Sequence, residues 1–332
     1  MSLPSSPILI LDSVASCRAW RRKALSEAKS VGFVPTMGAL HEGHLSLVRR
    51  SLAENDLTIV SIFVNPAQFA PHEDLATYPR TLPRDLELLA AQELHVTNTV
   101  RKPSAVFLPG VRDMYPSGIS QDVESQNGTF VEVKGYSHQM EGKSRPTFFR
   151  GVATVVTKLF NLVQPTNAYF GQKDIQQALL LRKLCSDLLF TYPDMDHLHI
   201  VPTARDPVDG LALSSRNAYL SADERLFAGT LYQALQCAES TWSQGGTKEQ
   251  SVSAAVTIIE RGREQATLKG VTVELDYIEM NHSDTFGILD GEARKDSESL
   301  ERTPVILSGA LWVGKTRLID NIILGGHGTM VN

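Results

Sequence analysis

The stretch from Val31 to Val48, which reads VGFVPTMGALHEGHLSLV, constrains the fold more than any other part of the chain. Its apolar start, Val31–Val34, predicts a buried strand. Pro35 and Gly38 then predict a tight turn, and from Gly43 onward apolar residues return at helical spacing. The stretch is therefore a strand, a short loop and the start of a helix, an arrangement in which backbone N–H groups can bind phosphate.

Two histidines, His41 and His44, lie where this loop enters the helix. Because they are three residues apart on a helical turn, their side chains project to the same side. Gly43 between them leaves room for a ligand to approach the backbone. The alternative is that both histidines are ordinary polar residues of an exposed loop. The flanking strand and helix favour a binding site, since a histidine pair in a core does not need Gly and Pro on both sides.

Strands and helices alternate through the first two hundred residues. The run Leu57–Val64 is β-branched and apolar, which is typical of a buried parallel strand. The apolar stripe of Thr147–Val163 is the clearest helical pattern in the chain. The same reasoning predicts helices at Ser13–Ser30, Thr81–Leu94 and Asp174–Leu189, strands at Val106–Leu108, Phe130–Val133, Asn167–Phe170 and His197–Pro202, an extended loop at Pro103–Gly128 and a flexible loop at Glu141–Pro146. This alternation predicts an α/β fold, a Rossmann-like doubly wound parallel sheet.

The pattern changes after about residue 204. Two helices and three strands are predicted there, at Ser221–Gln244, Ser251–Leu268, Val271–Met280, Val305–Leu307 and Leu318–Leu324. We therefore expect a domain at residues 1–204 and a smaller C-terminal α+β domain at residues 205–332. The tail around His327 is predicted to be disordered, and a lone histidine there does not predict a metal site.

Composition excludes several function classes. The chain of 332 residues is 42% hydrophobic and 21% charged with a net charge of −5, and no apolar run approaches a membrane span. Net charge alone does not exclude a nucleic-acid-binding surface, but there is no long basic run to indicate one, so we expect no nucleic acid as a partner. Three widely spaced cysteines indicate a reducing compartment, so we expect a cytoplasmic protein. An organellar transit segment is the alternative interpretation of Arg18, Arg21 and Arg22 among scattered serines.

Three further segments carry polar side chains at predicted strand ends. Asn65 and Gln68 follow the Leu57–Val64 strand, and an amide suits a hydroxy acid because it both donates and accepts. An Asn- and Pro-rich turn is the alternative there. Asp85 could reach Mg²⁺ through water, or it could be an acid in the first turn of a helix.

The Gly171–Gln177 segment contains Lys173, a point charge suited to phosphate, and Asp174, which can cap a helix or face a ribose. A solvated Lys–Asp pair is the alternative. Farther along, Leu213–Asn217 contains two serines followed by Arg216, whose guanidinium can hold phosphate oxygens bidentately.

These motifs resemble a known family. The His-x-Gly-His pattern is similar to the signature of the nucleotidylyltransferase and class I aminoacyl-tRNA synthetase superfamily, and Ser214–Arg216 resembles its second signature. The longer string Pro35–Leu47, together with Phe63–Phe69, resembles the pantoate–β-alanine ligase family. One segment departs from that family's R-P-G-H-F pattern, because Thr147 and Phe148 stand in place of its Gly and His.

The resemblance implies an ATP-dependent condensation of pantoate with β-alanine through a pantoyl adenylate, with Mg²⁺ and in a homodimer. His41, His44, Lys173 and Arg216 would be catalytic, and Asn65, Gln68 and Gln177 would bind the small substrates. Asp85 would be the residue near the metal. The implied ATP-binding set is Met37, Gly38, His41, His44, Gly171, Lys173, Asp174, Ala204, Leu213, Ser214, Ser215 and Arg216.

Two rival functions remain open on the sequence alone. A nucleotidylyltransferase that releases a dinucleotide would share the histidine and serine–arginine motifs but has no reason for both Gln68 and Gln177. A non-enzymatic, RNA-binding relative of the synthetases would need a basic face with exposed aromatic residues.

Overall fold

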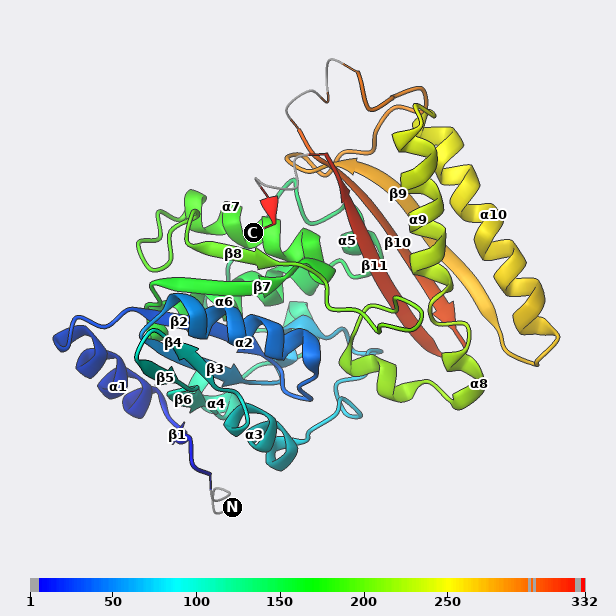
Figure 1. The fold of residues 1–332 in the computed structure, drawn as a ribbon. Coiled ribbons are helices and arrows are strands. Elements are labelled where there is room, and N and C mark those ends of the chain that lie inside the picture. The colour runs from blue at the N-terminus through cyan, green and yellow to red at the C-terminus, as the bar shows by residue number, and fades with distance from the viewer. Residues whose placement is uncertain (1–5, 298–299, 301–302, 326–329, 332) are drawn as a thin grey trace. The chain divides into compact units, whose positions relative to one another are not determined.

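The computed structural model describes residues 6–297, 300, 303–325 and 330–331 (Figure 1). Contacts divide the chain into two compact units. Unit 1 comprises Met1–Gly171 and Gln177–Val201, and unit 2 comprises Gln172–Gln176 and Pro202–Asn332. The second unit thus includes a short segment that lies well before residue 204. The predicted tail around His327 lies outside the described residues.

Unit 1 is built on a parallel sheet, as predicted. Its strand order is β1-β6-β3-β2-β7-β8, and every neighbouring pair is parallel. The strands are β1 (Leu9–Leu11), β2 (Val31–Thr36), β3 (Leu57–Ile62), β6 (Ala105–Phe107), β7 (Asn167–Gly171) and β8 (Leu198–Val201). The helices are α1 (Val14–Ser26), α2 (Glu42–Glu54), α3 (Leu82–Ala90), α4 (Val111–Met114), α5 (Glu141–Ser144), α6 (Phe148–Val163) and α7 (Ile175–Asp187). The fold class is therefore α/β and Rossmann-like.

The strand order reverses direction between β2 and β7, which makes this pair the switch point of the sheet. β2 pairs with β3 along six residues, but it pairs with β7 only through Gly32 and Phe33. The carboxyl ends of β2 and β7 are therefore not hydrogen-bonded to each other. Ligands of doubly wound sheets bind at this edge, and the predicted histidine turn follows β2 there.

The first helix belongs to the fold of unit 1. Ser13 caps α1 by accepting from the Ser16 N–H, and Arg21 is buried and donates from Nε to the Gln164 carbonyl at 3.0 Å. The arginines at the start of the chain thus lie in an ordinary helix. Among the described residues no helix is long and apolar enough to cross a membrane.

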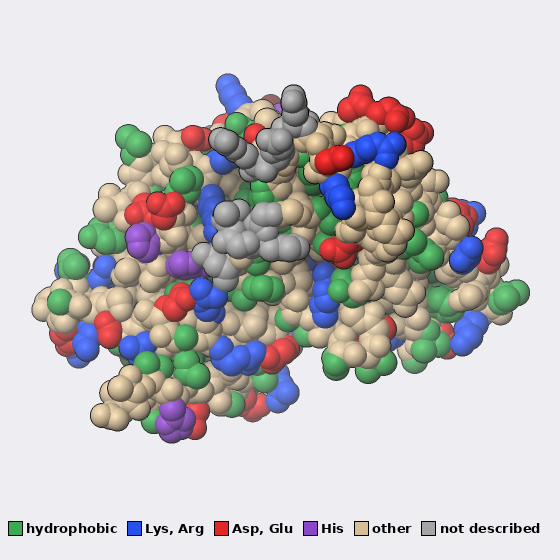
Figure 2. Space-filling view, turned by 45° about the horizontal axis from the view of Figure 1, so that its top comes forward, with side chains coloured by type: hydrophobic (Ala, Val, Ile, Leu, Met, Phe, Trp, Pro, Cys, Tyr) green, Lys and Arg blue, Asp and Glu red, His purple; other side chains and the backbone are tan. Residues whose placement is uncertain are grey.

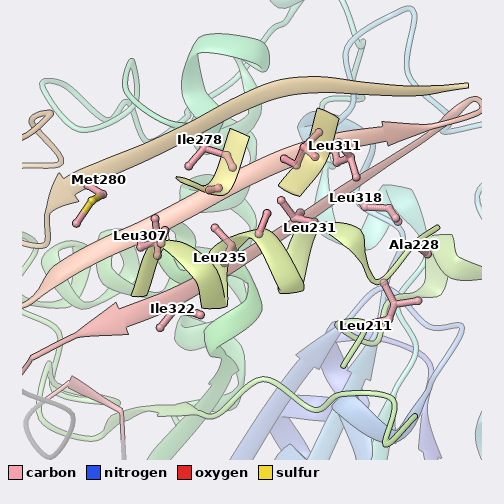
Figure 3. Packing of buried hydrophobic residues seen from close by; sticks show 14 of the residues in the cluster. Leu211, Ala228, Leu231, Leu235, Ile278, Met280, Leu307, Leu311, Leu318 and Ile322 are labelled. Atoms are coloured by element: carbon pink, nitrogen blue, oxygen red, sulfur yellow. The ribbon is translucent and has the colours of Figure 1, made fainter. Parts of the chain in front are cut away.

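Unit 2 packs helices against an antiparallel sheet of order β11-β10-β9. The strands are β9 (Val273–His282), β10 (Val305–Val313) and β11 (Thr316–Leu324), and the helices are α8 (Ala222–Arg225), α9 (Thr230–Ser243) and α10 (Lys248–Thr267). Figure 3 shows Leu231 and Leu235 of α9 turned toward Leu307 and Leu311 of the central strand. This cluster is the hydrophobic core of the unit.

Several predicted elements are wrong or incomplete. Phe130–Val133 is not a strand, because the Val131 N–H donates to the Thr154 hydroxyl at 2.9 Å instead of to a neighbouring strand. The predicted flexible loop at Glu141–Pro146 contains the short helix α5. The helix predicted to reach Leu94 ends at Ala90, and it is followed by a hairpin of β4 (Leu94–Val96) and β5 (Thr99–Arg101) that the pattern did not indicate.

A chain of buried and half-buried polar groups lies in unit 1 beside β7. Asn167 donates to Asn55 at 2.9 Å, and its own Oδ1 lies 2.9 Å from Nε2 of His199. His199 stacks on Tyr169, and its Nδ1 has no hydrogen-bond partner among the described residues. Burial lowers the pKa of His199, so this imidazole is held neutral.

We expect this histidine to make the protein less stable in mild acid. Since the folded pKa is below the unfolded value of about 6.5, the unfolded chain takes up the proton first, and stability falls as pH drops below about 6.5. Urea midpoints at pH 7.5 and pH 5.5 should therefore differ less in His199→Gln than in the wild type. Tyr169→Phe, which perturbs the same network but keeps the imidazole, should retain the wild-type difference. An identical pH dependence in His199→Gln and the wild type would contradict the assignment.

Candidate active site

The histidine turn follows β2 and has the geometry of a helix cap. His41 is the N-cap of α2, and its Nδ1 accepts a hydrogen bond from the Gly43 N–H at 3.1 Å. A backbone N–H only donates, so Nδ1 carries no proton and the ring proton lies on Nε2. The ring centroids of His41 and His44 are 4.1 Å apart at an interplanar angle of 46°. The structure thus brings the predicted pair together and presents a donor on His41.

Asp85 holds the turn that carries these histidines. Its Oδ2 accepts from the Ala39 N–H at 3.0 Å, and its Oδ1 accepts from the Leu40 N–H at 2.8 Å and from the Thr81 hydroxyl at 3.0 Å. The Asp85 side chain is only 1% exposed and lies in the first turn of α3. The carboxylate therefore binds two successive backbone donors of a loop whose Gly38 and Ala39 have φ of +85° and +50°.

These bonds change how the turn can bind an anion. The Gly38 N–H also has a protein acceptor, the Thr36 hydroxyl oxygen at 3.1 Å. Three backbone donors of this turn, those of Gly38, Ala39 and Leu40, therefore already have acceptors within the protein. In the part of the chain that the structure describes, no group of three or more His, Cys, Asp or Glu side chains could hold a metal ion. Asp85 as a residue near Mg²⁺ stays a prediction.

The second polar turn of unit 1 follows β3. Asn65 caps a 3₁₀ turn at Pro66–Gln68, and its Oδ1 accepts from the Ala67 N–H at 3.3 Å and from the Tyr115 hydroxyl at 2.6 Å. Its Nδ2 donates to Gln68 Oε1 at 3.0 Å and to the Gly151 carbonyl at 3.2 Å. Both Asn65 and Gln68 are buried. The two predicted amides thus lie in one network.

Gly151 allows α6 to lie directly against this turn. A Cβ atom added at Gly151 would meet the Ala67 carbonyl oxygen at 2.2 Å, a distance that no side chain can accept. The glycine therefore sets how closely the helix approaches the Asn65–Gln68 turn.

An ion pair reinforces the same turn from the segment where Thr147 and Phe148 replace the family's Gly and His. Arg145 donates to both carboxylate oxygens of Glu73 at 2.7 Å and to the Gln68 carbonyl at 3.0 Å. Its guanidinium lies 3.9 Å from the centroid of the Phe148 ring. Phe148 therefore supports the arginine in place of supplying an imidazole.

In unit 2, the Lys173 segment is held by a residue of β11. Asn321 donates to the carbonyls of Gln172 and Lys173, each at 2.9 Å. Lys173 Nζ lies 3.7 Å from the Asp174 carboxylate, so the pair considered as an alternative does form. The side chain of Lys173 is partly buried, with 19% of its surface exposed. A role of Lys173 in phosphate binding stays a prediction.

The serine–arginine segment of unit 2 follows a small hairpin. The Leu213 N–H donates to the Ala204 carbonyl at 3.0 Å, which brings these two predicted residues together. Ser214 then caps a 3₁₀ helix at Ser215–Tyr219 by accepting from the Arg216 N–H at 3.3 Å. Arg205 supports the hairpin, because it donates to the buried Asp320 carboxylate at 2.5 and 3.0 Å and to the Gly210 carbonyl.

Sequence reasoning missed four supporting residues: Tyr115, Arg145, Arg205 and Asn321. Their partners are distant along the chain, and Tyr115 lay in a segment read as an extended loop. The predicted residues themselves divide between the units. His41, His44, Asn65, Gln68, Asp85 and Gln177 belong to unit 1, whereas Lys173, Asp174, Ala204 and Leu213–Arg216 belong to unit 2.

A Rossmann-like parallel sheet with a histidine-capped helix after its central strand places this protein in the α/β class. A model of the pantoate–beta-alanine ligase family matches residues 9–323. The chain therefore belongs to the pantoate–beta-alanine ligase family.

Similar proteins match this chain along nearly its full length. The pantothenate synthetase of Thermotoga neapolitana is 44% identical over 316 residues, which are 95% of this chain and 99% of the relative. The pantoate–beta-alanine ligase of Saccharomyces cerevisiae is 41% identical over 329 residues, with the same coverages. The crystal structure of the pantothenate synthetase from Thermus thermophilus aligns with a TM-score of 0.76 at 38% identity, covering 95% of this chain and 99% of that one. The Francisella tularensis ligase, complexed with beta-gamma ATP and beta-alanine, aligns with a TM-score of 0.68 at 32% identity, covering 95% and 97%.

We expect Asp85→Asn to destabilise unit 1 and disturb the histidine turn. An amide has one acceptor atom, so one of the two backbone N–H groups of Ala39 and Leu40 would face an NH₂ group. Losing that buried acceptor should lower the free energy of unfolding by about 2–4 kcal/mol, as measured by urea denaturation.

The matched control is Asp113→Asn, at a surface position where the carboxylate accepts from only one backbone N–H, that of Gly110 at 2.9 Å. It should cost about 1 kcal/mol or less. Equal losses in the two variants would show that Asp85 is not the anchor of the turn.

Proposed function

We propose that this protein condenses pantoate with β-alanine in an ATP-dependent reaction that passes through a pantoyl adenylate and releases AMP and pyrophosphate. The observation that carries the proposal is the histidine pair of unit 1, with ring centroids 4.1 Å apart, after β2, and the Asn65–Gln68 turn after the neighbouring strand β3. The family membership and the ligand-bound Francisella tularensis relative support it.

The first step makes the acyl phosphate bond. An oxygen of the pantoate carboxylate attacks the α-phosphorus of ATP, and the bond from that phosphorus to the oxygen bridging to the β-phosphate breaks. Negative charge builds up on the leaving pyrophosphate, so catalysis needs donors and cations there. His41, with its proton on Nε2, and His44 are the proposed donors, and Lys173 and Arg216 are the proposed cations.

The second step makes the amide. The neutral amine of β-alanine attacks the acyl carbon of the adenylate, the bond from this carbon to the phosphate oxygen breaks, AMP leaves and the nitrogen loses a proton. Both nucleophiles belong to the substrates, so the protein contributes positioning and charge stabilisation. Gln68 and Gln177 are the proposed contacts of the small substrates. Asn65, also expected to bind them, uses both polar atoms of its amide within the protein and would act through Gln68.

Eight further residues are proposed to contact ATP. Met37 and Gly38 are the proposed backbone contacts of unit 1, together with Gly171. Asp174, Ala204, Leu213, Ser214 and Ser215 complete the set.

Magnesium enters the proposal as the counter-ion of ATP, held mainly by phosphate oxygens. Asp85 fits a direct metal ligand poorly, because its two oxygens accept three protein hydrogen bonds and the side chain is almost fully buried. A direct bond between Asp85 and the metal is therefore not part of the proposal, and a water-mediated contact stays a prediction. A homodimer and a cytoplasmic location likewise stay predictions.

The rival functions fit less well. On the face drawn in Figure 2, basic and acidic side chains are interspersed and do not form a continuous basic field, which RNA binding requires. A nucleotidylyltransferase would end at the first step. It gives no reason for a buried turn that holds two amides after β3, the strand next to the one that precedes the histidines.

The proposal predicts ATP–pyrophosphate exchange that depends on pantoate but does not need β-alanine. His44→Ala should lower that exchange by about 100-fold or more, because a donor to the developing charge is lost. His95→Ala, at an exposed position in β4, is the matched control and should exchange like the wild type.

Absence of pantoate-dependent exchange, in protein shown by calorimetry to bind ATP, would refute the adenylate. It would instead favour the nucleotidylyltransferase, and a screen of other acids and phosphates would follow.

A further inference from the structure

We propose that Asn65 and Tyr115 are positioning residues that fix the amide of Gln68 so that its NH₂ group, and not its carbonyl, faces the ligand. The ligand atom recognised at this position is then a hydrogen-bond acceptor, a carboxylate or hydroxyl oxygen of the acid substrate. The inference rests on the proposed function, because it assigns an orientation to a side chain of that same site.

Two backbone groups settle the orientation of Asn65. The Ala67 N–H can only donate, so the side-chain atom it faces at 3.3 Å must be Oδ1. The Gly151 carbonyl can only accept, so the atom it faces at 3.2 Å must be Nδ2. Asn65 is 1% exposed, and rotating its amide by 180° would place a donor against a donor and an acceptor against an acceptor. Its orientation is thus fixed without reference to any other side chain.

The orientation of Gln68 follows from that of Asn65. Since Nδ2 of Asn65 donates to Gln68 at 3.0 Å, the Gln68 atom that it meets is the carbonyl oxygen Oε1. The NH₂ group therefore lies on the other side of the planar amide. In the described part of the chain no group accepts a hydrogen bond from Nε2 of Gln68, and this nitrogen is not among the fully buried atoms. The nitrogen is left for an acceptor from outside the protein.

Tyr115 strengthens this arrangement from the far side of Asn65. Its hydroxyl donates to Oδ1 at 2.6 Å, so Oδ1 accepts from two donors and Nδ2 is held toward Gln68. Burial raises the pKa of Tyr115, which keeps the hydroxyl protonated and therefore a donor. Lys158 of α6 fixes the ring: its ammonium lies 3.9 Å from the ring centroid and donates to the Met114 carbonyl at 2.7 Å.

Gln68→Glu tests directly whether a donor or an acceptor of this side chain faces the ligand. The variant keeps the shape of the side chain, but its ionised carboxylate has only acceptors, so one oxygen can still accept from Asn65 while the other faces the ligand. We expect the KM for pantoate to rise about 100-fold or more at pH 8, with a much smaller change in kcat and an unchanged KM for ATP. Lowering the pH should bring the pantoate KM of this variant closer to that of the wild type, because a protonated carboxyl group again donates. Gln244→Glu, on the surface of α9's carboxyl end, is the control and should behave like the wild type.

Tyr115→Phe and Asn65→Asp test the positioning. Removing the hydroxyl should raise the KM for pantoate about 5- to 10-fold and leave kcat and the KM for ATP within about twofold. Asn65→Asp places oxygens against the Gly151 carbonyl and Gln68 Oε1, so its effect on the pantoate KM should be larger. Tyr192→Phe and Asn161→Asp are exposed counterparts in unit 1 and should leave all three constants unchanged.

The outcomes separate the inference from the function on which it rests. If wild-type protein forms no pantothenate from pantoate, β-alanine and ATP, the proposed function fails and the inference fails with it. If the wild type is active and Gln68→Glu keeps the wild-type KM for pantoate, the amide is an acceptor and the inference alone is overturned. The last case is that Gln68→Glu raises the KM for pantoate as expected. If Tyr115→Phe then changes no constant, or lowers kcat and raises both KM values alike, Tyr115 is not a positioning residue for Gln68.

Discussion

The hydrogen bonds from the Ala39 and Leu40 backbone to the Asp85 carboxylate are the interaction on which the histidine pair depends. A left-handed Ala39 costs about 1 kcal/mol relative to ordinary backbone, so the turn needs a partner that outweighs this strain. A buried carboxylate that binds two successive N–H groups supplies it, and the Thr81 hydroxyl adds a third bond. Because His41 is the next residue after this anchored pair, the cap of α2 and the spacing of the two imidazoles follow from the same contact.

The same solution appears after β3. Backbone that leaves a parallel sheet and turns inside the protein has N–H and carbonyl groups that must be paired. After β2 the partner is a carboxylate from α3, and after β3 it is the Asn65 amide, which bonds both to its own turn and to Gly151 of α6. In each case the side chain that fixes the turn comes from, or binds, a helix on the sheet. The two turns are thus held in place by side-chain contacts with the helices that pack on the sheet.

How much the sequence predicts depends on the distance over which a signal acts. The parallel sheet and α6 were predicted because β-branched runs and a helical apolar stripe are local patterns, and the histidine turn was found because its strand, glycine and helix are contiguous. Arg145 and Asn321 were missed, because they donate to carbonyls at Gln68 and at Gln172 and Lys173, 77 and about 150 residues away. Phe130–Val133 failed for a related reason: its alternating pattern suits a strand, but the partner of its backbone is a hydroxyl of α6.

The contacts that anchor the two turns share one feature: acceptor side chains are bonded within unit 1. Three acceptor side chains in the segments that follow β2 and β3 or contact them are bonded within unit 1: Asp85 to the histidine turn, Asn65 Oδ1 to Ala67 and Tyr115, and Glu73 to Arg145. The backbone bond to Nδ1 of His41 likewise leaves the ring proton on Nε2, a donor. A chain with a net charge of −5 can therefore build a surface suited to anions locally, by using its acceptors internally. Carboxylate and polyphosphate groups are the ligand groups that such a surface would select, because both present only acceptors.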